Sequence, residues 1–391
     1  MIYIIWGGPF PHGMASTIRI YLYALGLKEA SSCVKVLMTR PTEKKLKSFE
    51  NFVSEGNFEG VDFQYTCGRT KQSNHLIGKI FWVLFGSFHA AAILLFPRKK
   101  KSSVIIASES FFDLYFFRIV TYLAGLKFIV EKSELPLLYH KKTLLKALFL
   151  KTIIKLCNGI IVISDELKKY FEKEIGFNKK ILKVPIIYNP RELELKSENP
   201  FDSDKFNIVY NGDLSDKKDG ISILIESFSE FNKSFPQSIL HLLGRPASNN
   251  DLLKTEELVK KLKLTKQVLI KGFITRNKLI SFLNYADLLV LTKPFSVQSK
   301  YAFPTKLAEY LGTGKPVLVT NVGELKDYLI DNTNAFIAEP TIKSVYEKMV
   351  RVSQDLKFAK EVGIKGKELA ENSFDYRNHC KLMLQYIQSI K

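Results

Sequence analysis

The sequence predicts an α/β protein made of two doubly wound parallel sheets. Its 391 residues suit two or three domains of about 100–200 residues each. Apolar residues make up 46% of the chain and charged residues 25%, which excludes a disordered or collagen-like protein. Short apolar runs alternate with longer segments of helical spacing, and this alternation is typical of parallel sheets covered by helices.

The expected strands form two series. Several runs are continuously apolar, as in strands buried on both faces of a sheet. The first series lies at 2–6, 34–38, 61–65, 104–107, 128–130 and 159–163. The second lies at 207–210, 239–243, 268–270, 288–291, 316–319 and 335–337. Two Rossmann-like sheets that face each other would leave an interdomain cleft, and such sheets bind ligands beyond the carboxyl ends of their strands.

These two series divide the chain. We expect an N-terminal domain at 1–190 and a C-terminal domain at 206–373. Residues 191–205 carry mixed charges and little apolar content, so they are expected to form a linker. An amphipathic helix within 374–391 is a candidate to pack back on the N-terminal domain.

The chain is strongly basic, with a formal net charge of +19, and residues 1–200 hold 30 Lys and Arg against 17 Asp and Glu. This charge favours anionic partners: phosphorylated ligands, nucleic acid or a membrane surface. The cysteines lie far apart without CxxC spacing, which excludes a zinc ribbon or a disulfide framework and fits a reducing cytosol. The start, MIYIIWGGPF, has no basic region or cleavage site, so we expect no signal peptide and a cytoplasmic location.

Two segments bear on membrane contact. Residues 80–96 contain no formal charge and precede a run of four basic residues at 98–101. A spanning helix needs about 20 apolar residues, so a buried or interfacial helix is favoured over a membrane-surface helix or a true span. Residues 137–156 place five lysines among aliphatic residues, which suits either a helix on an anionic leaflet or a solvated helix face. An anionic membrane surface is therefore a predicted partner.

A glycine-containing turn at 7–16 follows the first expected strand and leads into a helix. Such a turn, here containing Gly13, exposes backbone N–H groups to a phosphate or a sugar hydroxyl. The spacing is not GxGxxG, and no acidic residue ends the second strand. The dinucleotide-binding pattern is therefore absent, which argues against a nicotinamide-dependent dehydrogenase. A Walker A sequence is absent from the chain.

The most specific stretch is KPFSVQSKYAFPTKLAEYLGTGKPVLVTNVGE at 293–324. Phe303, Pro304, Thr305 and Lys306 enter an expected helix that carries Glu309. The helix entry offers N–H groups, a hydroxyl and an ammonium to one anion, which suits a pyrophosphate. Glu309 could accept hydrogen bonds from two adjacent ribose hydroxyls. The alternative is that Glu309 only complements the helix dipole and that Lys306 is a solvated surface residue.

The block PTKLAEYLGTGKPVLVTNVGE resembles the donor-site signature of retaining glycosyltransferases of family 4, which have the GT-B fold of two facing Rossmann-like domains. Weaker matches extend the resemblance over most of the chain; they are Gly13, Ile163-Ser164, Asn211-Gly212, Leu243-Gly244, Gly272 and Ala286-Asp287. The resemblance implies transfer of a sugar from a nucleotide-sugar with retained configuration. It also implies that catalysis requires neither a metal nor another cofactor.

Two positions depart from the family pattern. The family commonly has two glutamates eight positions apart; the second matches Glu309, but Tyr301 stands at the first, which holds donor-sugar hydroxyls in the family. The family also often has an Arg and a Lys that bind the diphosphate, and here Asp213 and Lys218 stand in their places. The other cation could be Lys306, Lys293 or Arg245. The implied donor-binding residues are Gly13, Gly212, Lys218, Gly244, Arg245, Lys293, Tyr301, Phe303, Pro304, Thr305, Lys306 and Glu309.

The N-terminal half offers three candidate catalytic carboxylates. Glu131 and Glu134 end an expected strand, so either could bind the acceptor or act as a base, or could merely cap a turn. Glu109 stands where many relatives have a histidine. His12 lies on the glycine turn and could be either functional or structural. No histidine or acidic residues have metal-site spacing, so no metal site is predicted.

The leading hypothesis is a glycosyltransferase that acts at the inner face of the cytoplasmic membrane. It would move a sugar from a nucleotide-sugar to a glycan or lipid-linked acceptor, with retention, in cell-surface polysaccharide synthesis. One alternative is a nucleotide-sugar epimerase of the same fold. Another is a non-catalytic basic protein that binds lipid or nucleic acid. Nucleic acid is disfavoured because the lysines lie among aliphatic residues rather than among aromatic residues that could stack on bases.

Overall fold

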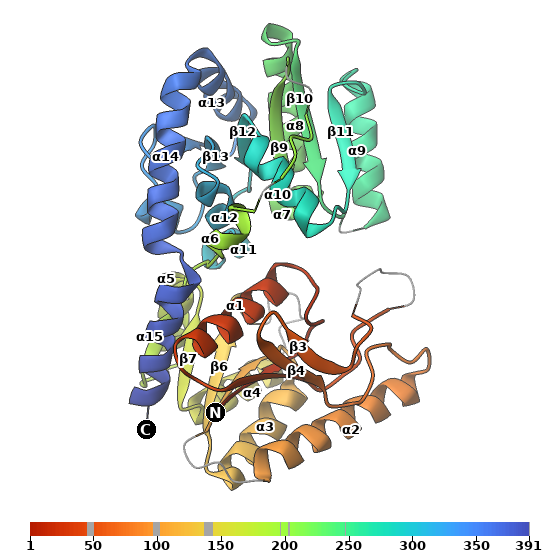
Figure 1. Ribbon diagram of the computed structural model, residues 1–391, viewed down its shortest axis with the longest axis vertical. Helices are drawn as coiled ribbons and strands as arrows, with labels where there is room; N and C mark the ends of the chain where they lie inside the picture. Colours follow the sequence, from red (N-terminus) through yellow and green to blue (C-terminus); the bar gives the residue numbers. More distant parts are fainter. Residues whose placement is uncertain are drawn as a thin grey trace. The chain divides into compact units, whose positions relative to one another are not determined.

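The computed structural model describes residues 1–44, 51–96, 102–136, 144–195, 197–201, 204–246 and 248–390. The chain forms two compact units, each built around one sheet (Figure 1). Unit 1 comprises Met1–Ile187 and Tyr376–Lys391, and unit 2 comprises Tyr188–Asp375. The segment 191–205, expected as a linker, thus lies within unit 2, and helix α6 (Pro190–Leu193) overlaps its start.

Unit 1 contains an eight-stranded sheet in the described residues, with the strand order β3-β4-β2-β1-β5-β6-β7-β8. Neighbouring strands are parallel except for β3, which runs antiparallel to β4. The bounds are β1 (Ile2–Trp6), β2 (Val34–Met38), β3 (Glu55–Phe58), β4 (Val61–Tyr65), β5 (Ser103–Ala107), β6 (Lys127–Lys132), β7 (Gly159–Val162) and β8 (Ile181–Lys183). The prediction did not include β3 and β8, because neither contains a run of buried apolar residues.

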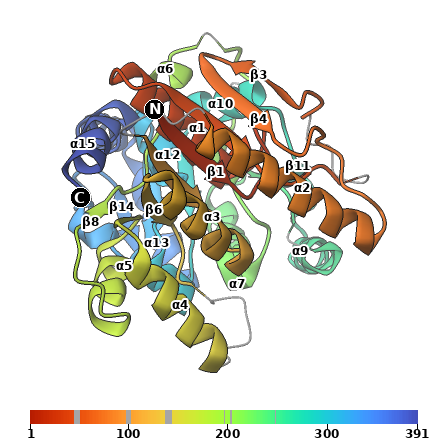
Figure 2. The same ribbon diagram turned by 90° about the horizontal axis from the view of Figure 1, so that it is seen from below.

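Helices cover both faces of this sheet (Figures 1 and 2). On one face, α1 (Ala15–Glu29) packs against α15 (Tyr376–Ser389), and both contribute to the apolar core. On the other face lie α2 (Leu76–Leu95), α3 (Phe111–Ala124) and α4 (Leu144–Leu156). After β1 the chain first adds β2, β4 and β3 on one side of that strand, and then adds β5 and the later strands on its other side. Because the crossovers are right-handed, this change of direction places α1 and α2 on opposite faces of the sheet. After β7 come α5 (Asp165–Lys169) and a π-helical turn at Tyr170–Glu174.

Unit 2 contains a six-stranded parallel sheet in the described residues, with the strand order β11-β10-β9-β12-β13-β14. The strands are β9 (Phe206–Asn211), β10 (Ser238–Leu243), β11 (Val268–Gly272), β12 (Leu288–Leu291), β13 (Val317–Thr320) and β14 (Phe336–Ala338). The helices are α7 (Asp216–Asp219), α8 (Ile221–Ser234), α9 (Asn249–Lys261), α10 (Arg276–Tyr285), α11 (Val297–Tyr301), α12 (Leu307–Gly312), α13 (Ile342–Gln354) and α14 (Leu356–Ser373), with a 3₁₀ turn at Leu325–Asp327.

The strand order of unit 2 indicates where a ligand can bind. The first strand, β9, lies between β10 and β12, so the chain builds the sheet outward in both directions from this point. In open α/β sheets, ligands bind beyond the carboxyl ends of the strands at such a reversal of order. Helix α12 follows β12 and packs against α6 and α14. Residues that follow β9 and β12, and those that lead into α12, therefore define the candidate site.

Candidate functional site

Lysine and aspartate side chains form a compact cluster beyond β9 and β12. We call Tyr210, Asp219, Lys293 and Lys306 the Asp219 cluster. The Lys293 Nζ lies 2.5 Å from Asp219 Oδ1, and the Lys306 Nζ lies 3.4 Å from Asp219 Oδ2. The Tyr210 hydroxyl donates a hydrogen bond to Asp219 Oδ2 at 2.7 Å. The Asp219 side chain is 4% exposed, so both lysines are held by a carboxylate that is withdrawn from solvent.

The charges in this region leave an excess of cations. Burial by itself would raise the pKa of Asp219, but Lys306 and Lys293 outweigh it and hold that pKa well below its usual value. Burial lowers the pKa of Lys306, with Asp219 acting in the opposite direction. Lys218 lies nearby, 3.8 Å from Asp213 Oδ2, and burial raises the pKa of Asp213. Three lysines therefore accompany two aspartates, an arrangement that can accept an added anion.

Glycines allow the strand ends to approach one another closely at the cluster. A Cβ atom at Gly212 would lie 2.6 Å from the Lys306 Nζ, and a Cβ atom at Gly244 would lie 2.0 Å from the Gly212 carbonyl oxygen. Gly244 also has φ +116°, which side-chain-bearing residues rarely adopt. The Gly212 N–H donates to the Leu243 carbonyl at 2.9 Å, and the Gly244 N–H donates to the Gly272 carbonyl at 2.8 Å. The carboxyl ends of β9, β10 and β11 are thereby linked.

A second group of charges surrounds Glu309 in the first turn of α12. Arg276, the first residue of α10, donates from Nη2 to Glu309 Oε1 at 2.7 Å. The same guanidinium donates to Glu192 Oε2 from Nη2 at 2.6 Å and from Nε at 2.8 Å. The Glu309 side chain is 12% exposed. Arg276 thus joins α6, α10 and α12 and fixes one oxygen of the Glu309 carboxylate.

Helix α12 is also attached to β9. The Asn211 N–H donates to the Tyr310 hydroxyl at 2.7 Å, and Tyr310 is fully buried. Because Lys306 immediately precedes α12 and Glu309 lies in its first turn, this attachment sets both side chains relative to the end of β9. The sequence pattern singled out Lys306 and Glu309, whereas it gave no functional role to Asp219 or Arg276.

The entry to α12 differs from the prediction. The helix begins at Leu307, and the Leu307 N–H already donates to the Pro304 carbonyl at 3.0 Å, so this N–H is not available to an anion. Phe303 is buried and packs against the rings of Tyr328 and Phe374, with centroids 5.3 and 5.9 Å away. Pro304 is buried and Thr305 is half-buried. The entry to α12 therefore offers an anion one N–H group fewer, and the nearby lysine side chains supply the positive charge.

Two further residues of the predicted donor set lie at neighbouring loops. The Arg245 guanidinium lies over the Phe273 ring, 4.2 Å from the ring centroid. Tyr301 is half-buried at the end of α11, and the Lys300 ammonium lies 5.4 Å from its ring centroid. Among the three cations that the sequence offered to accompany Lys218, Lys293 and Lys306 are the two that meet at Asp219.

In unit 1, Glu131 belongs to a buried ion pair. Its Oε1 accepts from Arg19 Nε at 3.0 Å and from the Ser133 hydroxyl at 2.6 Å. Arg19 also donates to the carbonyls of Val184 and Pro185, both at 2.6 Å. Arg19 and the Ser133 hydroxyl thus both occupy the same oxygen of the Glu131 carboxylate. Its geometry fits the anchoring of β6 to α1.

The other candidates of unit 1 are separate from this pair. Glu109 is exposed and lies 2.6 Å from the buried Lys132 ammonium, while Glu134 is exposed after β6. A Cβ atom at Gly13 would lie 2.2 Å from the Thr17 hydroxyl, so a side chain fills the space inside that turn. The His12 ring packs edge-on against Phe58 at 5.0 Å.

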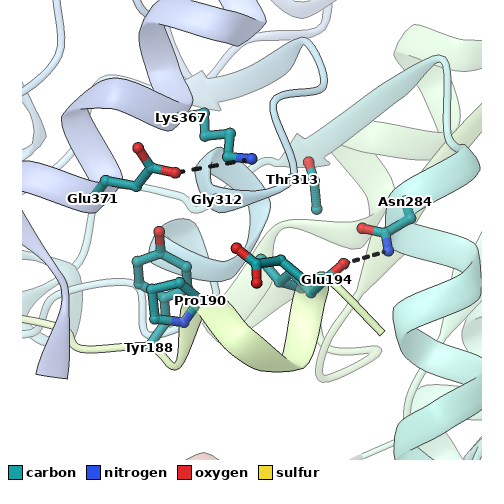
Figure 3. A pocket seen from close by; sticks show the side chains of 9 residues that line it. Tyr188, Pro190, Glu194, Asn284, Gly312, Thr313, Lys367 and Glu371 are labelled. Carbon is teal, nitrogen blue, oxygen red and sulfur yellow. Dashed lines mark hydrogen bonds and ion pairs between the residues drawn. The ribbon is translucent and has the colours of Figure 1, made fainter. Parts of the chain in front are cut away.

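A small polar pocket lies at the other end of α12 (Figure 3). Its volume is about 50 Å³, far below the roughly 300–1,000 Å³ of ligand pockets. The Asn284 side chain donates to the Leu193 carbonyl at 2.9 Å, and the ammonium of Lys367 lies 3.8 Å from the Glu371 carboxylate. This pocket suits ordered water rather than a nucleotide. In the described residues, no group of three or more His, Cys, Asp or Glu side chains is arranged to hold a metal ion.

Comparisons with known proteins give one family and one fold. Residues 192–369 match the sequence model of the family described as Glycosyl transferases group 1. No curated protein matches the chain.

Three solved structures illustrate the likeness of fold. Sucrose-phosphate synthase from Thermosynechococcus elongatus has a TM-score of 0.76 at 15% identity, over 99% of this chain and 98% of that chain. A glycosyltransferase from Rickettsia africae has a TM-score of 0.75 at 15% identity, over 100% of this chain and 98% of that chain. Anabaena Alr3699/HepE, in complex with UDP and glucose, has a TM-score of 0.71 at 14% identity, over 99% of each chain.

Proposed function

We propose that this glycosyltransferase, a GT-B protein whose residues 192–369 belong to the glycosyl transferases group 1 family, transfers a sugar from a nucleotide-sugar with retention of configuration. The observation that carries the proposal is the lysine excess around Asp219, at the point where the strand order of unit 2 reverses. The acceptor in this proposal is a glycan or a lipid-linked precursor of a cell-surface polysaccharide.

The Asp219 cluster would bind the diphosphate of the donor. Asp219 holds the ammonium groups of Lys293 and Lys306 in place before the donor arrives, and Lys218 adds a third cation nearby. When the glycosidic bond breaks, negative charge develops on the departing diphosphate. Cations that are already in position stabilise this charge with little reorganisation, which is the main way in which enzymes lower such barriers.

Glu309 would bind the ribose of the same nucleotide. It lies one turn from Lys306, and Arg276 occupies its Oε1 and so fixes the direction of the carboxylate. A carboxylate in a fixed direction can accept hydrogen bonds from adjacent hydroxyls, and such charge-assisted bonds are stronger than neutral ones. The structure of Anabaena Alr3699/HepE holds UDP, which supports a uridine nucleotide as the first probe for this chain.

Retention follows in this proposal from displacement on one face of the sugar. The bond between the anomeric carbon and the phosphate oxygen breaks, and the acceptor oxygen bonds to the same face of that carbon. The acceptor proton passes to the departing phosphate oxygen, so no side chain has to act as base. This route suits a unit 1 in which Glu131 is engaged by Arg19. The proposal includes no metal and no cofactor besides the nucleotide-sugar co-substrate.

We place the reaction in the cytoplasm, at the inner face of the membrane. Three of the four cysteines, Cys67, Cys157 and Cys380, are buried as thiols, which fits a reducing compartment. The basic N-terminal half of the chain fits an anionic acceptor or leaflet.

Isothermal titration with UDP tests the donor site. Lys306→Met and Glu309→Gln should each weaken UDP binding by about 10- to 100-fold, since hydrogen bonds to charged groups contribute about 1.5–3 kcal/mol. Lys343→Met, an exposed lysine of α13, is the matched control and should bind UDP like the wild type. If Lys306→Met and Glu309→Gln also bind UDP like the wild type, the site is assigned wrongly. Proton NMR of the product then tests retention, which an inverted anomer would refute.

A further inference from the structure

Helix α2 presents large apolar side chains to solvent. Six of them have exposed fractions between 48% and 83%: Leu76, Ile77, Ile80, Phe81, Phe85 and Phe88. By length and composition α2 could cross a membrane, with a mean hydropathy of 1.6 over its most apolar window. Only 22% of that window is buried. Of the two favoured expectations for residues 80–96, a buried helix is therefore wrong, and an interfacial helix stays a prediction.

The opposite side of α2 is fixed to unit 1. A Cβ atom at Gly86 would lie 2.1 Å from the Thr39 carbonyl oxygen, so the helix lies directly against the backbone there. The Thr66 hydroxyl donates to the Gly86 carbonyl at 2.7 Å, and the His89 Nδ1 lies 2.8 Å from the Thr66 carbonyl. A helix held along one side by such contacts cannot cross a bilayer without leaving its domain. Its apolar side must instead meet its partner from the outside.

The exposed side continues onto α3, which lies beside α2 in both ribbon views (Figures 1 and 2). The Phe88 and Phe116 rings meet edge to face at 5.3 Å, and Phe116 stacks on Phe112 at 5.4 Å. Helix α3 adds four exposed apolar side chains: Phe112, Ile119, Tyr122 and Leu123. We call these four and the six of α2 the α2–α3 face. An apolar surface this continuous marks an interaction site.

The charges around the α2–α3 face select its partner. Helix α2 contains no acidic residue and carries the exposed Lys79. The acidic residue of α3 in the described structure, Asp113, is buried and pairs with Arg40. On the neighbouring α4, Lys151 and Lys155 are exposed. Glu109, just before α3, is exposed but pairs with the Lys132 ammonium, so the unpaired formal charge next to this face in the described residues is mainly basic.

A basic rim around an apolar face complements an anionic bilayer, in which phenylalanine enters the acyl boundary and lysine meets the headgroups. Pairing with a second copy through the same face would instead bring the two basic rims together, because a two-fold interface is self-complementary. We propose that the α2–α3 face docks unit 1 on an anionic membrane surface, with α2 and α3 lying in the plane of the interface. This inference does not depend on the identity of the donor.

Vesicle flotation with the full-length protein tests the proposal. The protein should float with vesicles of phosphatidylcholine and phosphatidylglycerol, and less with pure phosphatidylcholine. Ile77→Ser/Leu123→Ser should lower the bound fraction at least about tenfold, since two exposed side chains lose their apolar burial. Leu253→Ser/Leu356→Ser, which changes two exposed apolar residues of unit 2, is the matched control and should float like the wild type. Both double variants should bind UDP normally, which separates docking from donor binding.

A second readout leaves the α2–α3 face intact. The chain has two tryptophans, and Trp82 lies on α2. In Trp6→Phe, brominated phosphatidylglycerol should quench the fluorescence of Trp82 on binding. The proposal fails if vesicles do not bind, if binding is as strong without anionic lipid, or if Ile77→Ser/Leu123→Ser floats like the wild type. It also fails if Trp82 is not quenched, or if the wild type is a dimer that this double variant dissociates.

Discussion

Replacing Arg276 with glutamine should weaken the hold of unit 2 on the ribose while leaving the diphosphate contacts in place. The Arg276 side chain contacts Glu309 and Glu192 directly, whereas the lysines of the Asp219 cluster pair with Asp219. Glutamine keeps a polar group of similar length but removes the positive charge. The Glu309 carboxylate then loses the partner that fixes its direction and lies near an uncompensated Glu192.

The structure gives the size of the effect. One of the three hydrogen bonds from Arg276 goes to Glu309, at 2.7 Å, between side chains that are 32% and 12% exposed. Hydrogen bonds between charged groups contribute about 1.5–3 kcal/mol when partly buried. A value of about 2 kcal/mol corresponds to a factor of about 30 in an equilibrium constant. Because this contact is present with and without UDP, its strength is an upper limit, and we expect the UDP affinity of Arg276→Gln to fall by at most about 30-fold.

Competition between UDP and 2′,3′-dideoxy-UDP is the decisive assay, because it isolates the ribose hydroxyls. The wild type should prefer UDP, whereas Arg276→Gln and Glu309→Gln should bind both nucleotides almost equally. Arg276→Lys should recover part of the preference, since lysine restores the charge but not the planar fork. Lys278→Gln changes an exposed residue of the same helix and should behave like the wild type. A full preference for UDP in Arg276→Gln, together with its loss in Glu309→Gln, would refute the positioning role.

Two further predictions concern the Asp219 cluster and its backbone. Burial lowers the pKa of Lys306, so this ammonium should lose its proton, and the protein its affinity for UDP, at a lower pH than an ordinary lysine would. Lys306→Arg should keep its affinity over the same range, because arginine stays charged. Titrations with UDP between about pH 7 and about pH 10 check this, and parallel pH profiles of the two proteins would contradict it. Gly244→Ala should lower the free energy of unfolding in urea more than Gly272→Ala. Both residues have positive φ, with strain of about 1–2 kcal/mol, but only at Gly244 does the new Cβ meet a carbonyl oxygen at 2.0 Å. Equal losses would exclude the contact as the cause.

The strands were predictable from sequence wherever the sheet buries both of their faces. The run at 2–6 coincides with β1, and the run at 288–291 coincides with β12, because every residue in such a strand is apolar. Strand β3 (Glu55–Phe58) escaped prediction since its residues are exposed or half-buried and it pairs at the edge of the sheet. Its formation depends on β4 as a neighbour, and a local pattern does not contain that neighbour.

The candidate site was predictable where its residues are close in sequence. Lys306 and Glu309 are three positions apart, so helical spacing alone placed them on one turn. The Arg276 contact to Glu192 joins residues 84 positions apart, and the ion pair of Arg19 with Glu131 joins residues 112 positions apart. Neither pair leaves a local signal. Glu131 was proposed as catalytic because it lies near the end of a strand. Its ion pair with Arg19 became evident only from the fold.

Helix α2 shows why an uncharged run does not reveal which of its sides faces inward. A soluble amphipathic helix normally turns its largest apolar residues toward the core. In α2 the inward positions are Gly86, Ser87, Ala90, Ala91 and Leu94, mostly small residues at helical spacing. They face inward because the Thr39 backbone leaves no room for a Cβ atom at Gly86, so the phenylalanines are displaced to the outside. The stripe of small residues was present in the sequence, and its meaning depended on the close approach of a backbone segment that lies 47 positions earlier.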